Sequence, residues 1–297
     1  MTRRRRRGYV LVVTLGLLVL AATLLVSIGR ASLRRAAVAR EAADDLQRRW
    51  GATSCRLAVM PAIESVLVDQ ERKVRRPVAV HHARLRLGEQ VFDLVLADEQ
   101  AKANANVLLD EADRARVESR LREAMTGSGM GHRIRLRPDP AAVPIRAAGS
   151  GGGGGAGAST APATQPILPK RVTGFGQVFD DVPPAQLIRA SELITCWGNG
   201  LVNVRRAPQA TLSLATSLTG VEIAALLRAR DGSASGSASG GLLNSANIKT
   251  RPGLHLTESS ACHSLWIIAR SNRRDWHYFA VLDDSDPRSG GIVSFVW

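Results

Sequence analysis

The first 60 residues carry the clearest pattern of apolar and polar positions in the chain. Residues 9–28 contain no charged side chain and are almost all apolar, and they directly follow five arginines and a glycine, Arg3 to Gly8. Twenty apolar residues in a helix span roughly 30 Å, which matches the hydrocarbon thickness of a bilayer. The pattern therefore predicts a single membrane-spanning helix, and the arginines predict that its N-terminus stays in the cytoplasm.

Beyond the apolar run, the sequence becomes amphipathic with helical spacing. Apolar residues recur among charged ones, at Leu33, Ala37, Leu46 and Trp50, and no proline interrupts the chain between Tyr9 and Met60. A stripe of this kind is typical of a helix that packs one face on a protein. We expect one helix of at least forty residues, half in lipid and half on a soluble domain.

Strand-like runs follow at two separate places in the chain. Val78–Leu87 and Val91–Leu96 are separated by a short loop containing Gly88, which indicates a hairpin. Near the C-terminus, Leu265–Arg270, Trp276–Leu282 and Gly291–Val296 indicate an antiparallel meander. We expect these strands to complete the sheet that begins at Val78, with Trp266, Trp276 and Trp297 as core or interface aromatics.

Helical and low-complexity segments separate the two groups of strands. A helix is predicted from about Asp110 to Met125. Two tracts rich in small and flexible residues, 147–169 and 232–241, cannot bury a core and bracket a module at about Lys170 to Asp231. The expected fold class is α+β, a long N-terminal helix on an antiparallel sheet with an inserted helical subdomain.

Composition and charge narrow the function only slightly. The net charge of +14 permits nucleic acid or anionic lipid as partners without requiring either. The three cysteines, Cys55, Cys196 and Cys262, allow at most one disulfide, for which Cys196 and Cys262 are the pair to test, or three buried free thiols. No nucleophile and base, phosphate loop or pair of catalytic carboxylates stands at motif spacing, so an enzyme is not expected.

The junction at Gly8 and Tyr9 is informative because the basic leader meets the apolar helix with no polar spacer. Type IV prepilin-like leaders are built in this way, and their peptidase cuts on the cytoplasmic side, which leaves the helix on the mature chain. Two alternatives remain open at this stage. Ordinary signal peptidase could cut near Ser27-Ile28-Gly29, or the segment could be an uncleaved anchor.

Three further features resemble one pilin-like subclass. Val13 stands at the fifth position of the expected mature helix, where most pilin-like chains carry a glutamate. Asp98, Glu99, Asn104 and Asn106 follow the pattern D-E-x-G-x-x-N-x-N, with Ala101 at the glycine. The chain then contains, in order, F-D-D-V, L-I, I-T, G-x-V-N-V-x-x-A-P and L-T-G-V between residues 179 and 221. This order is similar to the helical insertion of K-type minor pseudopilins of type II secretion, although Arg205 and Arg206 replace the usual asparagine and threonine.

The resemblance implies a division of the chain: leader 1–8, transmembrane helix 9–28, periplasmic helix 29–60, the first part of a pilin-like domain 61–109, the helical insertion 110–241, and C-terminal strands 242–297. It implies an inner-membrane protein with a periplasmic domain that caps the pseudopilus tip and starts its assembly. Implied partners are other minor pseudopilins, the major pseudopilin, the prepilin peptidase, the assembly platform and lipid. Calcium is the one cofactor that the resemblance suggests; Asp283, Asp284 and Asp286 offer oxygens, but we assign no metal ligand.

An alternative function rests on the stretch from Leu218 to Arg230, which resembles a helix-hairpin-helix. In the DNA-binding form, a glycine hairpin points backbone amides at a phosphate, here with Gly220, Arg228 and Arg230 as the candidate residues. A membrane-anchored competence receptor would share this organisation. Glu222 opposes it, because it places a carboxylate where the phosphate would sit, and DNA is not the expected partner.

Overall fold

The structure is a computed structural model that describes residues 3–126, 129–137, 172–233, 242–246, 255–270, 275–284 and 292–296; for 3–8, 233, 244–245 and 292–296 it describes the backbone alone. The low-complexity tract at 147–169, most of the one at 232–241, Asp286 and Trp297 lie outside the described residues. The chain divides into two compact units, Met1–Thr53 and Ser54–Trp297.

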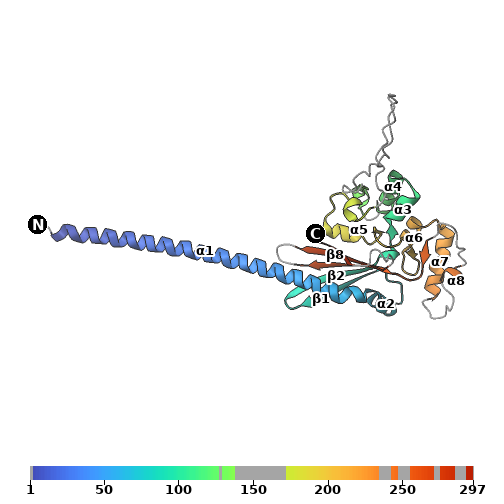
Figure 1. Cartoon of the computed structure of the whole chain (residues 1–297), viewed down its shortest axis with the longest axis horizontal. Helices are drawn as coiled ribbons and strands as arrows, with labels where there is room; N and C mark the ends of the chain where they lie inside the picture. The colour runs from blue at the N-terminus through green and yellow to red at the C-terminus, as the bar shows by residue number, and fades with distance from the viewer. Residues whose placement is uncertain are drawn as a thin grey trace, which may run out of the picture. The chain divides into compact units, whose positions relative to one another are not determined.

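Helix α1 (Arg3–Val59) accounts for the N-terminal unit and runs for 57 residues (Figure 1). It ends where the sequence first breaks helical geometry, because Pro61 occupies the first turn of the short 3₁₀ helix η1 (Met60–Ala62). All side chains from Tyr9 to Ile28 are exposed, and the helix is long and apolar enough to cross a membrane. The single long helix expected from the sequence is confirmed.

A five-stranded antiparallel sheet forms the centre of the second unit. Its order is β1-β2-β7-β8-β9, and the strands are β1 (Val80–Leu87), β2 (Gln90–Asp98), β7 (Cys262–Ala269), β8 (Trp276–Asp283) and β9 (Ile292–Val296). Strands β1 and β2 form the expected hairpin, in which Gly88 takes a left-handed conformation with φ of 61°. Strand β2 pairs directly with β7, so the C-terminal strands complete the sheet as expected.

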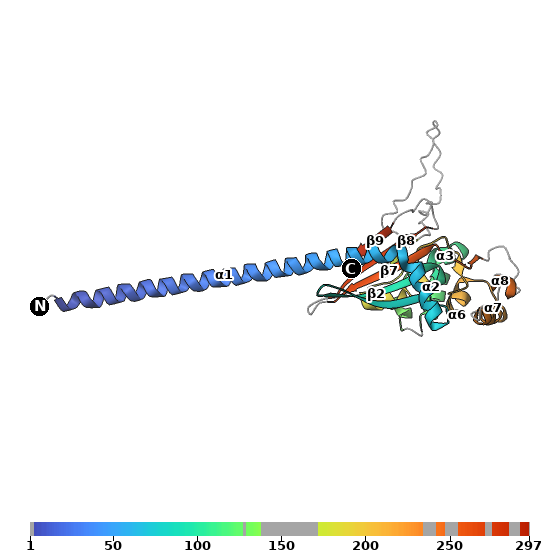
Figure 2. The same cartoon turned by 90° about the horizontal axis from the view of Figure 1, so that it is seen from below.

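Helices cover both faces of this sheet (Figures 1 and 2). On one face, helix α2 (Ile63–Val74) contacts β1 and β2, and its Ile63 and Leu67 are fully buried. On the other face, Val95 is paired with Trp266 and Trp266 with Phe279, so the three side chains project to the same side. They share one hydrophobic core with the helices of the insertion. The α+β class is therefore confirmed.

The insertion lies between β2 and β7, two strands that are neighbours in the sheet. Its elements are η2 (Glu99–Ala101), β3 (Ala103–Asn104), α3 (Ala105–Glu111), α4 (Arg114–Ala124), η4 (Gly131–Arg133), η5 (Phe175–Gln177), α5 (Pro184–Ala190), β4 (Ile194–Thr195), β5 (Val202–Asn203), α6 (Gln209–Ala215), α7 (Gly220–Ser233), α8 (Leu242–Ser245) and β6 (Leu256–Thr257). Two-stranded parallel pairs, β3 with β4 and β5 with β6, tie distant parts of it together.

The helix expected at about Asp110 to Met125 is in fact two helices, α3 and α4. Ala112 is extended, with φ of −141° and ψ of 165°, and this ends α3. Asp113 then starts α4, because its carboxylate accepts a hydrogen bond from the backbone N–H of Arg116. Asp113 thus caps a new helix, and the predicted continuous helix is interrupted here.

The insertion has two apolar cores. The larger one is continuous with the sheet and contains an aromatic cluster, in which Phe175, Trp197 and Trp266 surround Phe279 with ring centroids 4.6–5.6 Å from it. The smaller core joins α6 and α7 through residues such as Leu212, Ile223 and Leu226. The first core therefore fixes the insertion on the sheet, and the second holds the α6–α7 hairpin together.

Candidate functional site

The residues expected to act in processing and assembly lie on helix α1. Gly8 and Tyr9 are consecutive residues of this helix, so the junction between the basic and apolar segments is helical in this structure. Tyr9 is 74% exposed and Val13 is 43% exposed. Both side chains are thus available to lipid or to a helix of another protein.

The D-E-x-x-x-x-N-x-N pattern lies where the insertion leaves the sheet. Asp98 ends β2 and caps η2, accepting hydrogen bonds from the backbone N–H groups of Gln100 (2.9 Å) and Ala101 (3.2 Å). Asn104 caps α3 and donates to the backbone carbonyl of Trp197 (2.9 Å). Ala101 is fully buried without a left-handed backbone, which explains why alanine fits where the family pattern has glycine.

Asn106 has a larger role than the turn former that its position in the sequence suggests. Its side-chain oxygen accepts from the N–H of Val172 (2.7 Å), and its amide nitrogen donates to the carbonyls of Val172 (3.0 Å) and Cys196 (2.9 Å). A side-chain amide can both accept from a backbone N–H and donate to backbone carbonyls, so it can replace the hydrogen bonds that a neighbouring strand would make. Asn106 thus joins three segments that are far apart in the sequence.

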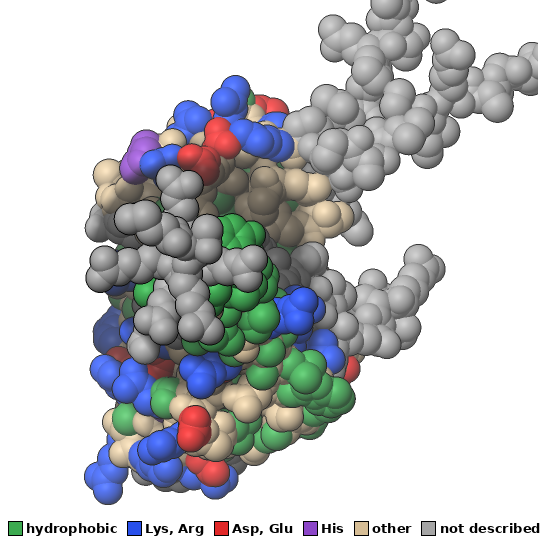
Figure 3. Space-filling view, turned by 90° about the vertical axis from the view of Figure 1, so that its left-hand side faces the viewer, with side chains coloured by type: hydrophobic (Ala, Val, Ile, Leu, Met, Phe, Trp, Pro, Cys, Tyr) green, Lys and Arg blue, Asp and Glu red, His purple; other side chains and the backbone are tan. Residues whose placement is uncertain are grey.

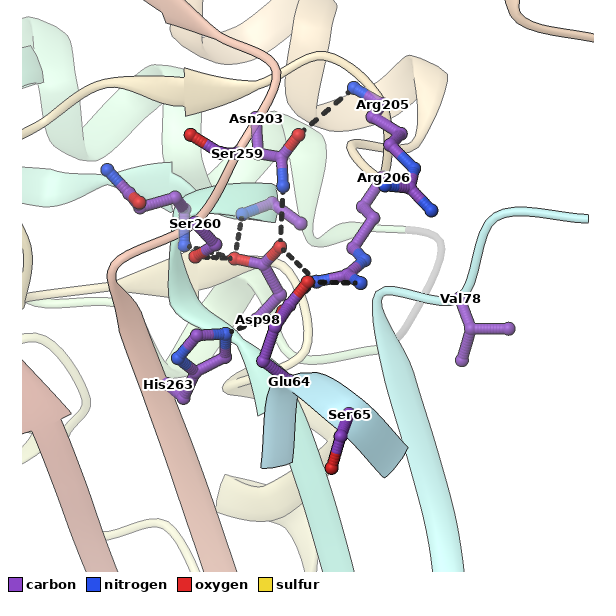
Figure 4. Close-up of polar contacts among 12 residues, drawn as sticks. Glu64, Ser65, Val78, Asp98, Asn203, Arg205, Arg206, Ser259, Ser260 and His263 are labelled. Atoms are coloured by element: carbon purple, nitrogen blue, oxygen red, sulfur yellow. Dashed lines mark hydrogen bonds and ion pairs between the residues drawn. The ribbon is translucent and has the colours of Figure 1, made fainter. Parts of the chain in front are cut away.

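A buried ionic cluster lies beside this pattern and joins helix α2, the end of β2, the start of β7 and the insertion (Figure 4). We call it the junction cluster, and its members are Glu64, Glu71, Asp98, Asn203, Arg205, Arg206, Ser260 and His263. Its centre is the Arg206 guanidinium, whose side chain is 1% exposed.

Arg206 contacts three carboxylates at once. Its Nη1 and Nη2 atoms donate to the two oxygens of Glu64 at 2.5 and 2.9 Å, which is the bidentate arrangement that guanidinium and carboxylate groups favour. Its Nε donates to Glu71 at 2.7 Å, and Nη1 also reaches Asp98 at 3.3 Å. A single cation thus connects α2 with the end of β2.

Asp98 and the neighbouring side chains complete the cluster. One oxygen of Asp98 accepts from Ser260 (2.6 Å), and the other accepts from the Asn203 amide (2.8 Å). The backbone N–H of Arg205 donates to Asn203 (3.1 Å), and its guanidinium donates to Glu71 (2.6 Å). The charges are paired and hydrogen-bonded, as buried charges must be. The cluster is therefore suited to holding elements together.

Sequence reasoning missed this cluster. The sequence shows Arg205 and Arg206 only as a departure from the usual asparagine and threonine, whereas in the structure both side chains pair with α2. The turn itself is regular, with the N–H of Arg206 donating to the carbonyl of Asn203. No local pattern links the two arginines to Glu64 and Glu71, which lie more than 130 residues earlier. The only available signal was a pair of adjacent arginines in an otherwise apolar motif.

The junction cluster makes folding stability sensitive to acid. Burial alone would raise the pKa of Glu64 from its ordinary value of 4.5, but hydrogen bonds from His263 and Arg206 lower it to about 2. A lowered pKa contributes stability that is complete above pH 4.5 and is lost as the pH falls towards 2. We expect the thermal midpoint of the full chain in detergent to fall across this window, and Glu64→Gln to weaken that pH dependence. A variant with the same acid profile as the wild type would contradict the assignment.

A second buried ion pair lies next to the junction cluster. The Lys102 ammonium and the Ser264 hydroxyl both donate to one oxygen of Glu99, and the Glu99 and Lys102 side chains are almost completely buried. The other oxygen of Glu99 has no hydrogen-bond partner among the described residues. Separating this pair would leave a charge in an apolar core, so we regard it as structural.

Cys55, Cys196 and Cys262 are all free and buried in the structure. Burial is the main cause that raises the pKa of each thiol, to about 11 for Cys55, and the negative charge of Glu99 adds to it at Cys196 and Cys262. Raised thiol pKa values disfavour the reactive thiolate. The structure therefore has the three free thiols, not the Cys196–Cys262 bridge.

The candidate phosphate-binding hairpin lies between α6 and α7. The Glu222 carboxylate accepts hydrogen bonds from the backbone N–H (2.8 Å) and the hydroxyl (2.9 Å) of Thr219, which forms a capping box at the start of α7. Arg230 donates to the carbonyl of Ala207 (2.9 Å) and Arg228 to that of Ala224 (3.2 Å). An acidic side chain thus occupies the hairpin where a phosphate would bind, and both arginines have partners within the chain.

The aspartates considered for calcium are not gathered into a site in the described part of the chain. Asp283 accepts a hydrogen bond from the backbone N–H of Gly198 (3.0 Å) and so anchors the insertion to the end of β8. Asp284 follows it directly, and Asp286 lies outside the described residues. Among the residues searched, no group of three or more His, Cys, Asp or Glu side chains could hold a metal ion.

Comparison with known proteins gives one similar structure. No family model matches the chain, and no curated protein matches it. A chain of "The Crystal Structure of the GspK-GspI-GspJ complex from enterotoxigenic Escherichia coli Type 2 Secretion System" is similar over 84% of this chain and 98% of its own length, with 12% identity and a TM-score of 0.37. A TM-score this low does not assign a function to the chain.

Proposed function

We propose that the chain is a K-type minor pseudopilin, which caps the tip of a type II secretion pseudopilus, initiates its assembly and so assists protein export across the outer membrane. It is anchored in the inner membrane by residues 9–28, with the N-terminus in the cytoplasm and the domain in the periplasm. Its partners are the other minor pseudopilins, the major pseudopilin, the prepilin peptidase and the assembly platform.

The observation that carries the proposal is where the insertion lies. Strands β2 and β7 are paired neighbours, yet the chain between them contains all of the helices from α3 to α8. The resemblance noted in the sequence implies a pilin-like sheet interrupted by a helical insertion of this kind. A long N-terminal helix with an exposed apolar segment is the second element that such a subunit needs, and α1 supplies it.

The absence of a carboxylate at Val13 supports the tip position. In pilin-like assemblies, a glutamate at this position neutralises the N-terminal ammonium of a neighbouring subunit. A chain with valine there can donate its own ammonium to another subunit but cannot receive one. A subunit that can donate but not receive this contact suits the tip, where no other subunit lies ahead of it in the filament.

DNA binding remains the weaker alternative. The hairpin that would bind a phosphate already holds Glu222, which accepts hydrogen bonds from Thr219. Arg230 is directed to the carbonyl of Ala207. With the Thr219 amide bonded to Glu222 and both arginines bonded to backbone carbonyls, the hairpin offers a phosphate little beyond the general attraction of a basic protein, which is weak at physiological salt.

The proposal predicts cleavage between Gly8 and Tyr9. We expect the chain extracted from membranes to begin at Tyr9, because the basic leader directly adjoins the apolar helix. N-terminal sequencing and intact mass would test this, with a strain lacking prepilin peptidase as the control, in which residues 1–8 should be retained. A mature protein that keeps these residues in the presence of the peptidase, or that begins near Ala31, would contradict the proposal.

A further inference from the structure

The end of helix α2 carries an unusual group of charges. Arg72, Lys73, Arg75 and Arg76, which we call the α2 cationic patch, are all exposed. Arg72 pairs with the exposed Asp69 at 3.2 Å, but Lys73, Arg75 and Arg76 form no hydrogen bond or ion pair with the described residues. The patch thus places three unneutralised cations within four residues.

Several other exposed arginines of the domain are paired with carboxylates. Arg84 and Arg270 share Asp93, and Arg135 and Arg137 share Asp180. The view in Figure 3 shows acidic side chains lying beside several of the Lys and Arg side chains on that face. Lys73, Arg75 and Arg76 lack such a partner among the described residues, and Glu71, the acidic residue directly before the patch, is turned inward to Arg205 and Arg206.

The local backbone holds the patch in one arrangement. Arg75 ends α2 in a left-handed conformation with φ of 53°, which is uncommon for a residue other than glycine. Pro77 restricts the following turn, and the N–H of Val78 donates to Glu71 at 3.2 Å, which closes the loop back onto α2. The cations are therefore presented on a fixed turn, which lowers the entropy lost when they bind a partner.

Helix electrostatics explain only part of the patch. Arg72 and Lys73 lie in the last turn of α2, where cations complement the macrodipole. Arg75 and Arg76 follow the helix and have no such role. Lys73 also acts on the nearby His81, whose pKa is lowered by burial first and then by the charges of His82 and Lys73. Mutual repulsion of this kind is a cost that a bound anion would relieve.

We propose that the α2 cationic patch binds a carboxylate-rich face of a neighbouring protein subunit. This inference rests on the proposed function, because it takes the partner from the same assembly. Arginine is enriched in protein interfaces, and its fork matches carboxylates. Val74 lies within the patch and is 40% exposed although it continues the buried face of Ile63 and Leu67, so it adds an apolar contact of the kind that protein interfaces contain.

A protein partner fits the patch better than lipid headgroups do. Helix α1 continues for about 30 residues beyond Ile28, which is about 45 Å of helix. The charge of a membrane surface is screened within about 8–10 Å at physiological salt. The length of α1 that follows the apolar segment is thus several times this screening distance.

Zero-length crosslinking with a carbodiimide tests the proposal directly, because it joins a lysine amine only to a carboxylate in contact with it. The chain has four lysines; Lys102 is buried, and Lys170 and Lys249 are told apart from Lys73 by peptide mass spectrometry. In native membranes that contain the full chain and the other pseudopilins, we expect Lys73 to be joined to an aspartate or glutamate of a pseudopilin. Lys73→Arg, which keeps the charge, should abolish this crosslink.

Two charge-matched variants complete the experiment. Arg75→Gln with Arg76→Gln leaves the Lys73 amine in place and should lower the crosslink yield about fivefold, since each exposed ion pair contributes modestly. Arg116→Gln with Arg189→Gln removes two exposed cations elsewhere and should leave the yield unchanged. Thermal unfolding of each variant shows whether the fold is retained.

Three results would overturn the patch proposal. The first is a chain that co-assembles with pseudopilins along α1 while Lys73 forms no crosslink to them. The second is an equal loss of yield in the two charge-matched variants. The third is binding to phosphatidylglycerol vesicles that depends on Arg75 and Arg76, which would assign the patch to a membrane. Failure to co-assemble at all would instead contradict the proposed function.

Discussion

Arg206→Met should lower the free energy of unfolding by about 3–5 kcal/mol, which is the cost of removing one partner from a buried ionic network. The variant would leave Glu64, Glu71 and Asp98 close together without the guanidinium that connects them. Thermal unfolding of the full chain in detergent, followed by circular dichroism, measures the effect. Because methionine has a similar length and no polar atom that needs a partner, the loss would report the charge more than the volume.

The adjacent arginine provides a matched control for this experiment. Arg205 pairs only with Glu71, and its side chain is 45% exposed, so Arg205→Met should cost less than about 1 kcal/mol. Arg206→Lys keeps the charge without the planar fork and should fall between the two. Equal effects of Arg205→Met and Arg206→Met would show that Arg206 is not the centre of the junction cluster.

Deletion of this chain should abolish export by the secretion system, and the chain expressed alone should not form homopolymers. Homopolymers are not expected because Val13 supplies no carboxylate to pair with the N-terminal ammonium of another copy. An unpaired charge at the centre of a bilayer costs about 2.5–3.5 kcal/mol on insertion scales, so each N-terminal ammonium needs an acceptor and this chain offers none. Cysteine crosslinking along α1 measures the association, with and without the other minor pseudopilins.

A single substitution distinguishes the role of the missing carboxylate from non-specific hydrophobic association of the apolar helix. Val13→Glu supplies the acceptor and should produce crosslinks between copies of the chain. Val12→Glu adds the same charge one position earlier, on a residue that is also exposed, and should not. Long homopolymers of the unmodified chain, or unchanged export after its deletion, would contradict the tip position.

Local patterns in the sequence were sufficient for α1 and for the strands of the sheet, whereas helix α2 was not predicted. Twenty residues without charge and the absence of proline before Pro61 predict α1, since helix formation there depends only on neighbouring residues. Alternating strand patterns with Gly88 at the turn predict the β1–β2 hairpin. The helix predicted at 110–125 was wrong in one respect, because the segment forms two helices and Asp113 caps the second one. The spacing of apolar residues does not show whether an aspartate lies inside a helix or caps a new one.

Tertiary structure alone decided the junction cluster and the α2 cationic patch. The sequence by itself determined that this chain has an apolar N-terminal helix, an antiparallel sheet and an insertion, because each follows from periodicity or from turn residues. It did not determine that Arg206 meets Glu64, Glu71 and Asp98, because these residues are distant in the chain and become neighbours only when β2 pairs with β7 and α2 covers the sheet. The same folding turns Glu71 inward and leaves Lys73, Arg75 and Arg76 without a carboxylate partner among the described residues, since the pairing of a charge depends on which surfaces are brought together.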